Sequence, residues 1–374
     1  MRVIQCDGSP GAVRELDAAI QAMLAGSEAV APLGLQQARP PRDPGAGHAI
    51  LGTSGSSGAH KWVQLNAAAL IASASATHNR LGGPGAWLLA LPACHVAGLQ
   101  VLVRAAQAGH RPAVLDLRNG FDPVAFNATA QWLTSQTARC YTALVPTQLT
   151  RLLDTDSEPL TGFAAVLLGG AAAPQQLLRR TRIAGVPVVT TYGMTETAGG
   201  CVYDGRPLDG THVRLDSTGI IELTGPTLAS GYLDAPEATA EAFHDGWFRT
   251  RDLGRLDPQG LLHVLGRADD LIITGGLNVA PAEVEAVLIS LPGVAAACVV
   301  GVPDAEWGQR VTAAVIPADP GHPPDPSALR AAARRLLTGA QVPREIVLFD
   351  ELPLRGVGKP DRSAVRTILT ARKP

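Results

Sequence analysis

The sequence lacks the features that mark membrane proteins and nucleic-acid-binding proteins. It has no apolar run near the ~20 residues that a membrane-spanning helix requires, and no block of Lys and Arg that would attract a phosphate backbone or an anionic bilayer. Its 31 basic and 33 acidic residues nearly balance, giving a net charge of -2. We therefore expect neither a nucleic acid nor a membrane as a partner.

Cysteine is also scarce and scattered, with only five residues in the chain and no two of them closer than 46 positions. This spacing favours neither a disulfide framework nor a CxxC metal site, and we expect buried, reduced thiols. The opening segment MRVIQCDGSP lacks the basic-then-apolar profile of a signal peptide. We interpret the chain as a cytoplasmic protein.

A length of 374 residues allows two or three domains. A helical pattern over residues 13–24 and a Pro/Gly/Arg-rich loop over 38–47 come first. Short apolar runs then alternate with helical segments up to Tyr192, which is typical of a mostly parallel sheet covered on both faces. The expected strands are 49–53, 86–91, 112–115, 140–145, 163–168 and 186–190, and the expected helices are 66–79, 96–108, 122–136 and 174–183.

The pattern changes twice after Tyr192. Short, turn-punctuated strands at 212–215, 220–224, 247–249 and 261–265 predict a small β subdomain. Beyond Arg267, expected helices at 281–291 and 327–337 and strands at 295–302, 310–317 and 346–349 predict a small α+β domain. The expected fold class is thus α/β, with a large N-terminal domain and a small C-terminal domain.

The first motif with chemical content is the segment TSGSSGAHK at residues 53–61. Glycines and hydroxyl residues let backbone N–H and side-chain O–H groups surround a polyphosphate, and Lys61 adds a positive charge. The segment is not a Walker A loop, because His60 and Trp62 stand where that motif needs Gly and Ser/Thr. A flexible linker is the alternative interpretation of the same composition.

Further polar motifs follow along the chain. YGMTET at 192–197 continues an expected strand into a turn, where α/β sheets bind ligands, although an ordinary surface turn has the same appearance. Thr250-Arg251-Asp252 contains a carboxylate able to accept both hydroxyls of a ribose. GRADD at 266–270, GGLN at 275–278 and GVGKP at 356–360 come next, and each alone is a weak signal.

In this order the motifs resemble the successive core motifs of the adenylate-forming superfamily, which includes acyl- and aryl-CoA ligases, adenylation domains and luciferases. The resemblance covers residues 48–362. It implies a reaction in which a carboxylate attacks the α-phosphorus of Mg·ATP to form an acyl-adenylate, after which a thiol displaces AMP to give a thioester. It also implies ATP, Mg²⁺ and coenzyme A as ligands, and a homodimer as the usual assembly.

The resemblance assigns a role to each matched position. Glu196 would bind Mg²⁺, Thr195 would contact the α-phosphate, and Lys359 would touch the carboxylate and the α-phosphate oxygen. The ATP site would comprise Thr53, Ser54, Gly55, Ser56, Ser57, Gly58, Lys61, Gly169, Gly170, Ala171, Tyr192, Gly193, Met194, Thr195, Asp252, Arg267 and Lys359. Gly193 would also border the acid, Gly275 and Gly276 would contact CoA, and Asp269 would be the hinge residue. The implied division is an N-terminal domain at 1–266, a hinge at 267–269 and a mobile C-terminal domain at 270–374.

Two residues bear on the acid substrate. His95, in LPACHVAGL, resembles the histidine that borders the acyl pocket, and a core histidine at the start of the next helix is the alternative. Arg104 lies nine residues further on in an apolar helix, where a charge needs a partner. A second carboxylate on the substrate and a structural ion pair are both consistent with it.

The chain departs from longer relatives in its shortened front and in SSGAHK where TTGxPK is usual. These features look most like the compact actinobacterial o-succinylbenzoate:CoA ligases of menaquinone synthesis, which implies an aromatic keto-diacid as the substrate. The alternatives are another aryl- or acyl-CoA ligase, an enzyme that loads a carrier protein, and a non-catalytic adenylate-binding relative.

Overall fold

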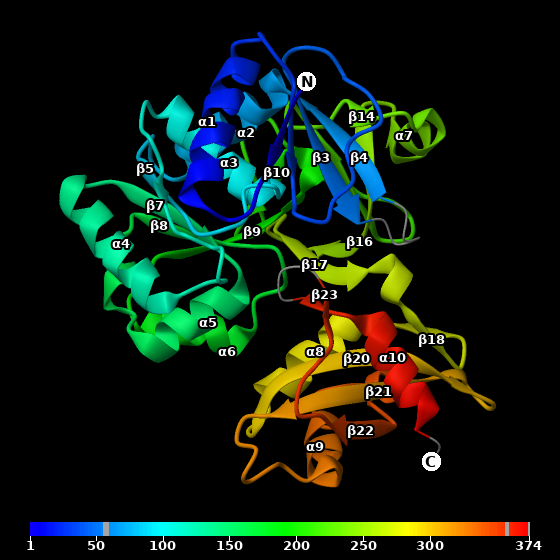
Figure 1. Ribbon diagram of the computed structural model, residues 1–374. Coiled ribbons are helices and arrows are strands. Elements are labelled where there is room, and N and C mark those ends of the chain that lie inside the picture. The colour runs from blue at the N-terminus through cyan, green and yellow to red at the C-terminus, as the bar shows by residue number, and fades with distance from the viewer. Residues whose placement is uncertain (55–59, 356–358, 373–374) are drawn as a thin grey trace.

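The computed structural model describes residues 1–54, 60–355 and 359–372, and shows a large domain followed by a smaller C-terminal domain (Figure 1). The chain starts in a five-stranded sheet whose order is β1-β2-β3-β4-β14. These strands are β1 (Arg2–Gln5), β2 (Val30–Leu33), β3 (His48–Ser54), β4 (His60–Asn66) and β14 (Gly231–Tyr232). Helix α1 (Pro10–Leu24) joins β1 to β2 and packs its apolar face into the core.

A seven-stranded sheet, in the order β11-β10-β9-β8-β7-β5-β6, forms the centre of the large domain. Strands β5 (Ala86–Leu89), β6 (Ala113–Val114), β7 (Cys140–Leu144), β8 (Ala165–Leu168) and β9 (Val188–Met194) are parallel to one another. The antiparallel strands β10 (Gly199–Tyr203) and β11 (Arg206–Pro207) complete one edge.

Helices cover both faces of this sheet, as its apolar sequence predicts. The helices are α2 (Ala67–Arg80), α3 (Val96–Gln107), α4 (Pro123–Gln136), α5 (Pro146–Thr155) and α6 (Gln175–Ile183), with a 3₁₀ turn at Glu158–Gly162. Side chains of β5 alternate between two cores: Trp87 and Leu89 pack with α1–α3, whereas Leu88 packs with α4 and α5. The doubly covered, mostly parallel sheet is therefore confirmed.

The structure corrects one assignment in this domain. Residues 49–53 are a strand, but they belong to the five-stranded sheet, where β3 and β4 form an antiparallel hairpin. The expectation that they join the parallel sheet is wrong because the following segment, HKWVQLN at 60–66, is itself a strand that pairs residue by residue with β3. Strands β1, β2 and β4 and helix α5 were not expected.

The small β subdomain follows the predicted pattern. It contains β12 (His212–Leu215), β13 (Ile220–Thr224), β15 (Phe243–His244), β16 (Trp247–Leu256) and β17 (Leu262–Arg267), and helix α7 (Pro236–Ala242) lies beside it. All contacts between neighbouring strands here are antiparallel. Its sheet positions Asp252 and Arg267 directly opposite each other on β16 and β17.

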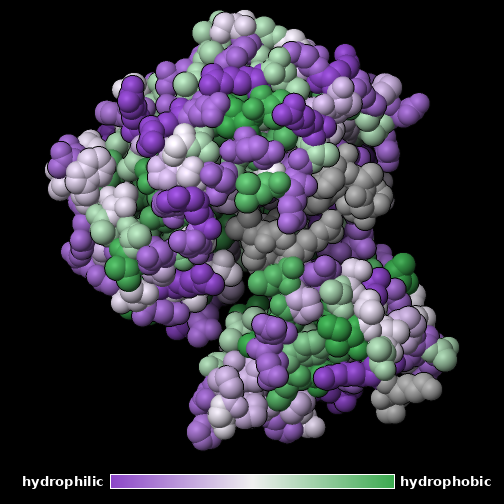
Figure 2. Space-filling model, viewed as in Figure 1, coloured by the Kyte–Doolittle hydropathy of each residue, from purple (hydrophilic) through white to green (hydrophobic). Residues whose placement is uncertain are grey.

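The C-terminal domain has its own apolar core, because two clusters of buried side chains contain only residues beyond 271. After a 3₁₀ turn at Ala268–Asp270 come β18 (Ile272–Thr274), β19 (Leu277–Val279), α8 (Pro281–Ser290), β20 (Val294–Asp304), β21 (Gly308–Pro317), α9 (Pro326–Ala333), a turn at Gly339–Gln341, β22 (Glu345–Leu348), β23 (Leu354–Arg355), β24 (Lys359–Pro360) and α10 (Arg362–Ala371). Figure 2 shows the two domains as distinct lobes with a notch between them.

No helix within the described ranges is long and apolar enough to cross a membrane. The space-filling view instead shows polar side chains spread widely over the visible surface of both lobes (Figure 2).

An ion-pair network ties the start of α10 to the rest of the C-terminal domain. The Arg362 guanidinium pairs with both carboxylate oxygens of Glu285 on α8, with a distance of 2.8 Å for Nη2 to Oε2, and its Nε lies 3.2 Å from Asp270 Oδ2. It also donates to the Val299 carbonyl at 2.9 Å. Because Glu285 is largely buried, losing its cationic partner would leave a desolvated charge.

We therefore expect Arg362→Ala to lower the free energy of unfolding of the C-terminal domain by about 3 kcal/mol, the cost of breaking a largely buried ion pair from one side. Urea unfolding measures this loss, with Arg366→Ala on the exposed face of the same helix as the control. Equal stability of the two variants would contradict the prediction.

Candidate active site

Thr195 and Glu196 lie in a 3₁₀ turn (Thr195–Thr197) at the carboxyl end of β9, the edge where open α/β sheets bind ligands. Hydrogen bonds from the Thr197 hydroxyl and from the backbone hold this turn. The Thr197 hydroxyl accepts the Met194 N–H at 3.0 Å and donates to the Gly199 carbonyl at 2.8 Å, and the Ala229 N–H donates to the Glu196 carbonyl at 2.8 Å. The turn is thus fixed by the protein without any ligand.

The Glu196 carboxylate accepts hydrogen bonds from its own backbone N–H and from a tyrosine hydroxyl, and the charges of two cations act on it. The Tyr232 hydroxyl donates to its Oε1 at 3.0 Å, and the Lys61 ammonium lies 4.6 Å from the centre of the same tyrosine ring. Burial raises the pKa of Glu196. The hydrogen bonds from its own backbone N–H and from Tyr232, together with the charges of Lys61 and Arg267, oppose that rise only in part. The ionised carboxylate is therefore incompletely neutralised in the protein alone.

This arrangement fits Mg²⁺ that is bound together with a polyphosphate. Among the described residues, no cluster of three or more His, Cys, Asp or Glu side chains could hold a metal ion. Mg²⁺ usually keeps several waters and takes only one or two protein carboxylates when phosphates supply the other ligands. A single half-buried carboxylate whose pKa is raised by its partial loss of water is the protein contribution that such a site needs.

A second polar group forms around Asp252. The Tyr192 hydroxyl donates to Asp252 Oδ2 at 2.8 Å, and Arg267 Nη1 lies 3.9 Å from Asp252 Oδ1. Burial and the adjacent Asp252 carboxylate raise the pKa of Tyr192, so its phenol stays protonated at neutral pH. The carboxylate is held in place and mostly shielded from solvent, which suits an acceptor for the hydroxyls of a ribose.

The same arginine also contacts the residue expected at the hinge. Arg267 Nη2 lies 2.9 Å from Asp269 Oδ2, and Arg251 Nη1 lies 3.4 Å from that oxygen. Burial alone would raise the pKa of Asp269, but the hydrogen bond and charge of Arg267, with the charge of Arg251, outweigh it and lower the pKa. Asp269 is therefore held ionised against two arginines.

The small residues of the expected ATP site lie at the ends of β8 and β9. A Cβ on Gly193 would lie 2.1 Å from the Gly199 carbonyl oxygen, and a Cβ on Gly169 would lie 2.4 Å from Thr191 Oγ1. The backbone of β10 therefore requires glycine at position 193, whatever ligand binds, whereas a side chain at position 169 would have to displace the Thr191 hydroxyl. Gly170, Ala171 and Met194 lie in the same two strand-end segments.

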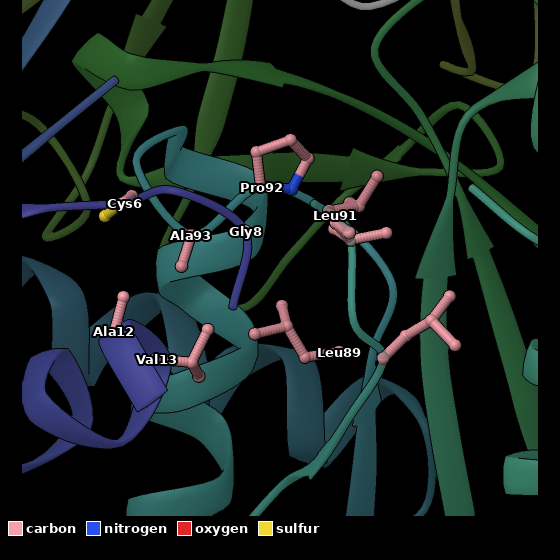
Figure 3. A pocket seen from close by; sticks show the side chains of 10 residues that line it. Cys6, Gly8, Ala12, Val13, Leu89, Leu91, Pro92 and Ala93 are labelled. Atoms are coloured by element: carbon pink, nitrogen blue, oxygen red, sulfur yellow. The ribbon is translucent and has the colours of Figure 1, made fainter. Parts of the chain in front are cut away.

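His95 precedes the first turn of α3 and is exposed. Helix α3 packs behind the Glu196 turn, since its residues Val96 and Gln100 border the space beside Gly199. An apolar cavity lies next to the loop before His95, but none of the expected site residues lines it (Figure 3). Its lining residues are Cys6, Gly8, Ala12, Val13, Leu89, Leu91, Pro92, Ala93, Leu115 and Leu117.

Three expected site residues do not join this group. Arg104 is buried, with Nη2 3.4 Å from the Tyr203 hydroxyl and its guanidinium carbon 5.1 Å from the centre of the Trp87 ring. It lies about 13 Å along α3 from His95, at 1.5 Å per residue. Gly275 and Gly276 form the β18–β19 turn in the C-terminal domain, with Gly275 against Trp307.

Part of the expected phosphate segment lies outside the described residues, namely Gly55, Ser56, Ser57 and Gly58. The side chains of Ser54 and Lys359 lie outside the description as well. Thr53 is described, and its hydroxyl donates to the Lys61 carbonyl at 3.3 Å across the hairpin. The structure therefore brings Lys61, Tyr192, Thr195, Glu196, Asp252 and Arg267 into one region.

Tyr232 belongs to none of the sequence motifs, although it contacts Glu196 directly. It reaches the site because β14 pairs with β4, placing Tyr232 opposite Val63 and close to Lys61. The sequence contains only a weak signal for this contact, because Tyr232 is a single aromatic residue after a glycine and lies 36 positions from Glu196.

Comparison with known families and structures agrees with this geometry. Residues 6–233 match the model of the AMP-binding enzyme family, and residues 283–359 match the AMP-binding enzyme C-terminal domain. The chain is 48% identical over 323 residues to a protein of Mycobacterium tuberculosis named probable 2-succinylbenzoate–CoA ligase, an alignment covering 84% of this chain and 83% of that protein.

Two solved structures of the o-succinylbenzoate coenzyme A synthetase of Bacillus subtilis are similar to this one. The complex with its acyl-adenylate intermediate aligns with a TM-score of 0.77 at 27% identity, covering 94% of this chain and 80% of that one. The complex with ATP and a magnesium ion aligns with a TM-score of 0.75 at 27% identity, covering 93% and 81%.

The raised pKa of Glu196 means that the folded protein binds its proton more readily than the unfolded chain does. At pH 7 the ionised carboxylate therefore opposes folding. We expect Glu196→Gln to leave the melting temperature of the ligand-free protein unchanged or raised, because an amide oxygen still accepts from Tyr232.

The same substitution should weaken the binding of ATP in the presence of Mg²⁺ by about 10–100-fold. Thermal unfolding and calorimetric titration measure the two effects, with the exposed Glu237→Gln as the matched control. A large fall in melting temperature would show that the carboxylate stabilises the fold instead.

Proposed function

The chain belongs to the AMP-binding enzyme family, and on that premise we propose that it is an ATP-dependent acid:CoA ligase acting on o-succinylbenzoate. The observation that carries the substrate assignment is the 48% identity to the mycobacterial protein over 84% of this chain. The similarity to a synthetase bound to its acyl-adenylate supports the two-step reaction.

In the first half-reaction, an oxygen of the succinyl carboxylate attacks the α-phosphorus of ATP and the bond to the β-phosphate oxygen breaks. The products are the acyl-adenylate and pyrophosphate. Mg²⁺, held through Glu196, supplies positive charge that neutralises the phosphate oxygens when it is bound. The residues of this chain then have to hold the carboxylate of the acid against the α-phosphate of ATP, although both groups are negatively charged.

The residues divide this work by location. Lys61 lies on the Glu196 side of the region and is suited to the β- and γ-phosphates. Asp252, fixed by Tyr192 and Arg267, is suited to the ribose hydroxyls. Thr195 beside Glu196 has a hydroxyl to donate to the α-phosphate, and His95 is assigned to the acid side of the site.

In the second half-reaction, the sulfur of CoA attacks the acyl carbonyl, AMP leaves, and the thiol loses its proton. We propose that the C-terminal domain turns about a hinge at 267–269 between the two steps, with Asp269 as the pivot and 1–266 and 270–374 as the moving bodies. The short 3₁₀ turn between β17 and β18 supports this division. Gly275 and Gly276 are assigned to the CoA-binding orientation.

The proposal includes a cytoplasmic location, which follows from ATP and CoA as co-substrates, and a homodimer as the assembly. Arg104 is not assigned to the substrate, because its contacts with Tyr203 and Trp87 lie away from His95.

A panel of acids tests the substrate. With ATP, Mg²⁺ and CoA, o-succinylbenzoate should give AMP, pyrophosphate and a CoA thioester faster than benzoates, hydroxycinnamates or fatty acids. Faster turnover of a monocarboxylic acid would overturn the substrate but retain the enzyme class. Replacing CoA by a phosphopantetheinylated carrier protein distinguishes a ligase from a loading enzyme, and no acid-dependent AMP release in any arm would overturn the activity.

Lys359 lies in the C-terminal domain, on the strand that pairs with β23, and its neighbour Pro360 completes that strand. If Lys359 serves adenylation alone, Lys359→Ala should slow acid-dependent pyrophosphate release by about 10²–10³, as for loss of one donor to developing negative charge. Thioester formation from supplied acyl-adenylate and CoA should stay near the wild-type rate, because the domain has then turned away.

Arg366→Ala removes an exposed positive charge from the same domain and should change neither rate. Equal losses in both half-reactions of Lys359→Ala, with the fold intact, would contradict the two-orientation mechanism.

A further inference from the structure

Ala198, directly after the Glu196 turn, has a backbone conformation that alanine rarely adopts. Its φ is 51° and its ψ is 36°, in the left-handed region, and the residue is fully buried. The other described non-glycine residues with positive φ are all aspartates, whose short polar side chains tolerate this region. Alanine has no such side chain, so the surroundings must hold it there.

Two buried side chains donate hydrogen bonds to the same atom, the carbonyl oxygen of Ala198. Ser73 Oγ lies 3.0 Å from it and Gln100 Nε2 lies 2.8 Å from it. Neither residue has any exposed surface, and they come from α2 and α3, two neighbouring helices behind the turn. We call this pair of donors the Ala198 clamp.

The clamp completes the support of Glu196 from the C-terminal side. The Ala229 N–H holds the Glu196 carbonyl, Thr197 ties the turn back to Met194, and the clamp fixes where the chain leaves it. Only one residue separates Glu196 from Ala198. Without the clamp, the Ala198 carbonyl loses the two side-chain donors that accompany its left-handed backbone conformation.

We propose that Gln100 and Ser73 are positioning residues, which hold the Glu196 carboxylate where Mg·ATP binds by fixing the Ala198 carbonyl. The inference rests on the proposed function for the identity of the ligand. Gln100 also belongs to the helix that starts after His95, so one rigid element sets the positions of both the carboxylate turn and the acid-side histidine. The alternative is that the two donors only stabilise the packing of α2 and α3.

Two variants remove the donors with little change in volume, Gln100→Met and Ser73→Ala. Thr77→Val is the matched control, because Thr77 is equally buried on α2 and its hydroxyl bonds to the Tyr203 hydroxyl at 3.0 Å instead of to the turn. Calorimetry of ATP binding with and without Mg²⁺ gives the factor by which Mg²⁺ tightens binding. That factor should fall about 10-fold in each clamp variant and stay unchanged in Thr77→Val.

Hydrogen–deuterium exchange of the ligand-free protein provides a second readout that is independent of activity. Peptides covering residues 194–200 should exchange faster in both clamp variants than in Thr77→Val. If Gln100→Met fails to fold, Ser73→Ala, which deletes one hydroxyl, decides the question alone.

Lower melting temperatures with unchanged exchange in this segment and an unchanged Mg²⁺ factor would mean that the clamp is only structural, and would overturn the proposal. A wild-type protein that shows no effect of Mg²⁺ on ATP binding and no acid-dependent AMP release would instead overturn the proposed function. The exchange experiment would still decide whether the clamp holds the turn.

Discussion

The candidate active site depends on the cost of keeping one carboxylate ionised in a mostly buried position. Glu196 accepts hydrogen bonds from its own backbone N–H and from Tyr232, and these bonds together with the charges of Lys61 and Arg267 do not fully offset the loss of hydration. A charge in this state favours any ligand that brings positive charge to it. In the proposed function this cation is Mg²⁺ bound together with the phosphates of ATP, for which Lys61 supplies a second positive charge. The ionised Glu196 carboxylate thus both opposes folding of the ligand-free protein and favours the binding of Mg·ATP, and both effects come from its incomplete neutralisation.

The sequence predicted those parts of the fold in which local pattern and tertiary packing agree. Apolar strands alternating with helices identified the doubly covered sheet, and Asp122 with Pro123 marked the start of α4 as the structure has it. The hairpin β3–β4 was missed because its second strand, HKWVQLN, follows a glycine-rich segment and precedes a helix without a turn signal. Strands β1 and β2 are four residues each, too short for a periodic pattern to appear.

The sequence predicted those site residues whose polar side chains lie within recognisable motifs. Tyr192, Glu196, Asp252 and Arg267 carry charge or hydrogen-bonding groups at recognisable spacings, and the structure brings them together. Tyr232, Ser73 and Gln100 act through contacts with residues between 36 and 125 positions away, and nothing in their own neighbourhoods distinguishes them. Arg104 is a conspicuous charge in an apolar helix, and it contacts the Trp87 ring and the Tyr203 hydroxyl, while its buried Nε has no hydrogen-bond partner among the described residues.

Arg267 contacts two carboxylates that belong to different parts of the molecule, Asp252 in the β subdomain and Asp269 at the proposed hinge. In the two-orientation mechanism, a rotation that moves Asp269 away from Arg267 leaves Asp252 as the remaining carboxylate partner of that arginine, and so strengthens the interaction between Arg267 and Asp252. Thermodynamic linkage makes this effect reciprocal. If the domain orientation changes the free energy of binding a ribose at Asp252, then binding of the ribose changes the free-energy difference between the two orientations by the same amount. Arg267 and Asp269 are partly solvated whereas Asp252 is mostly buried, so dissolved salt screens the contact with Asp269 more than the contact with Asp252. In the two-orientation mechanism, ionic strength therefore shifts the balance between the two domain orientations.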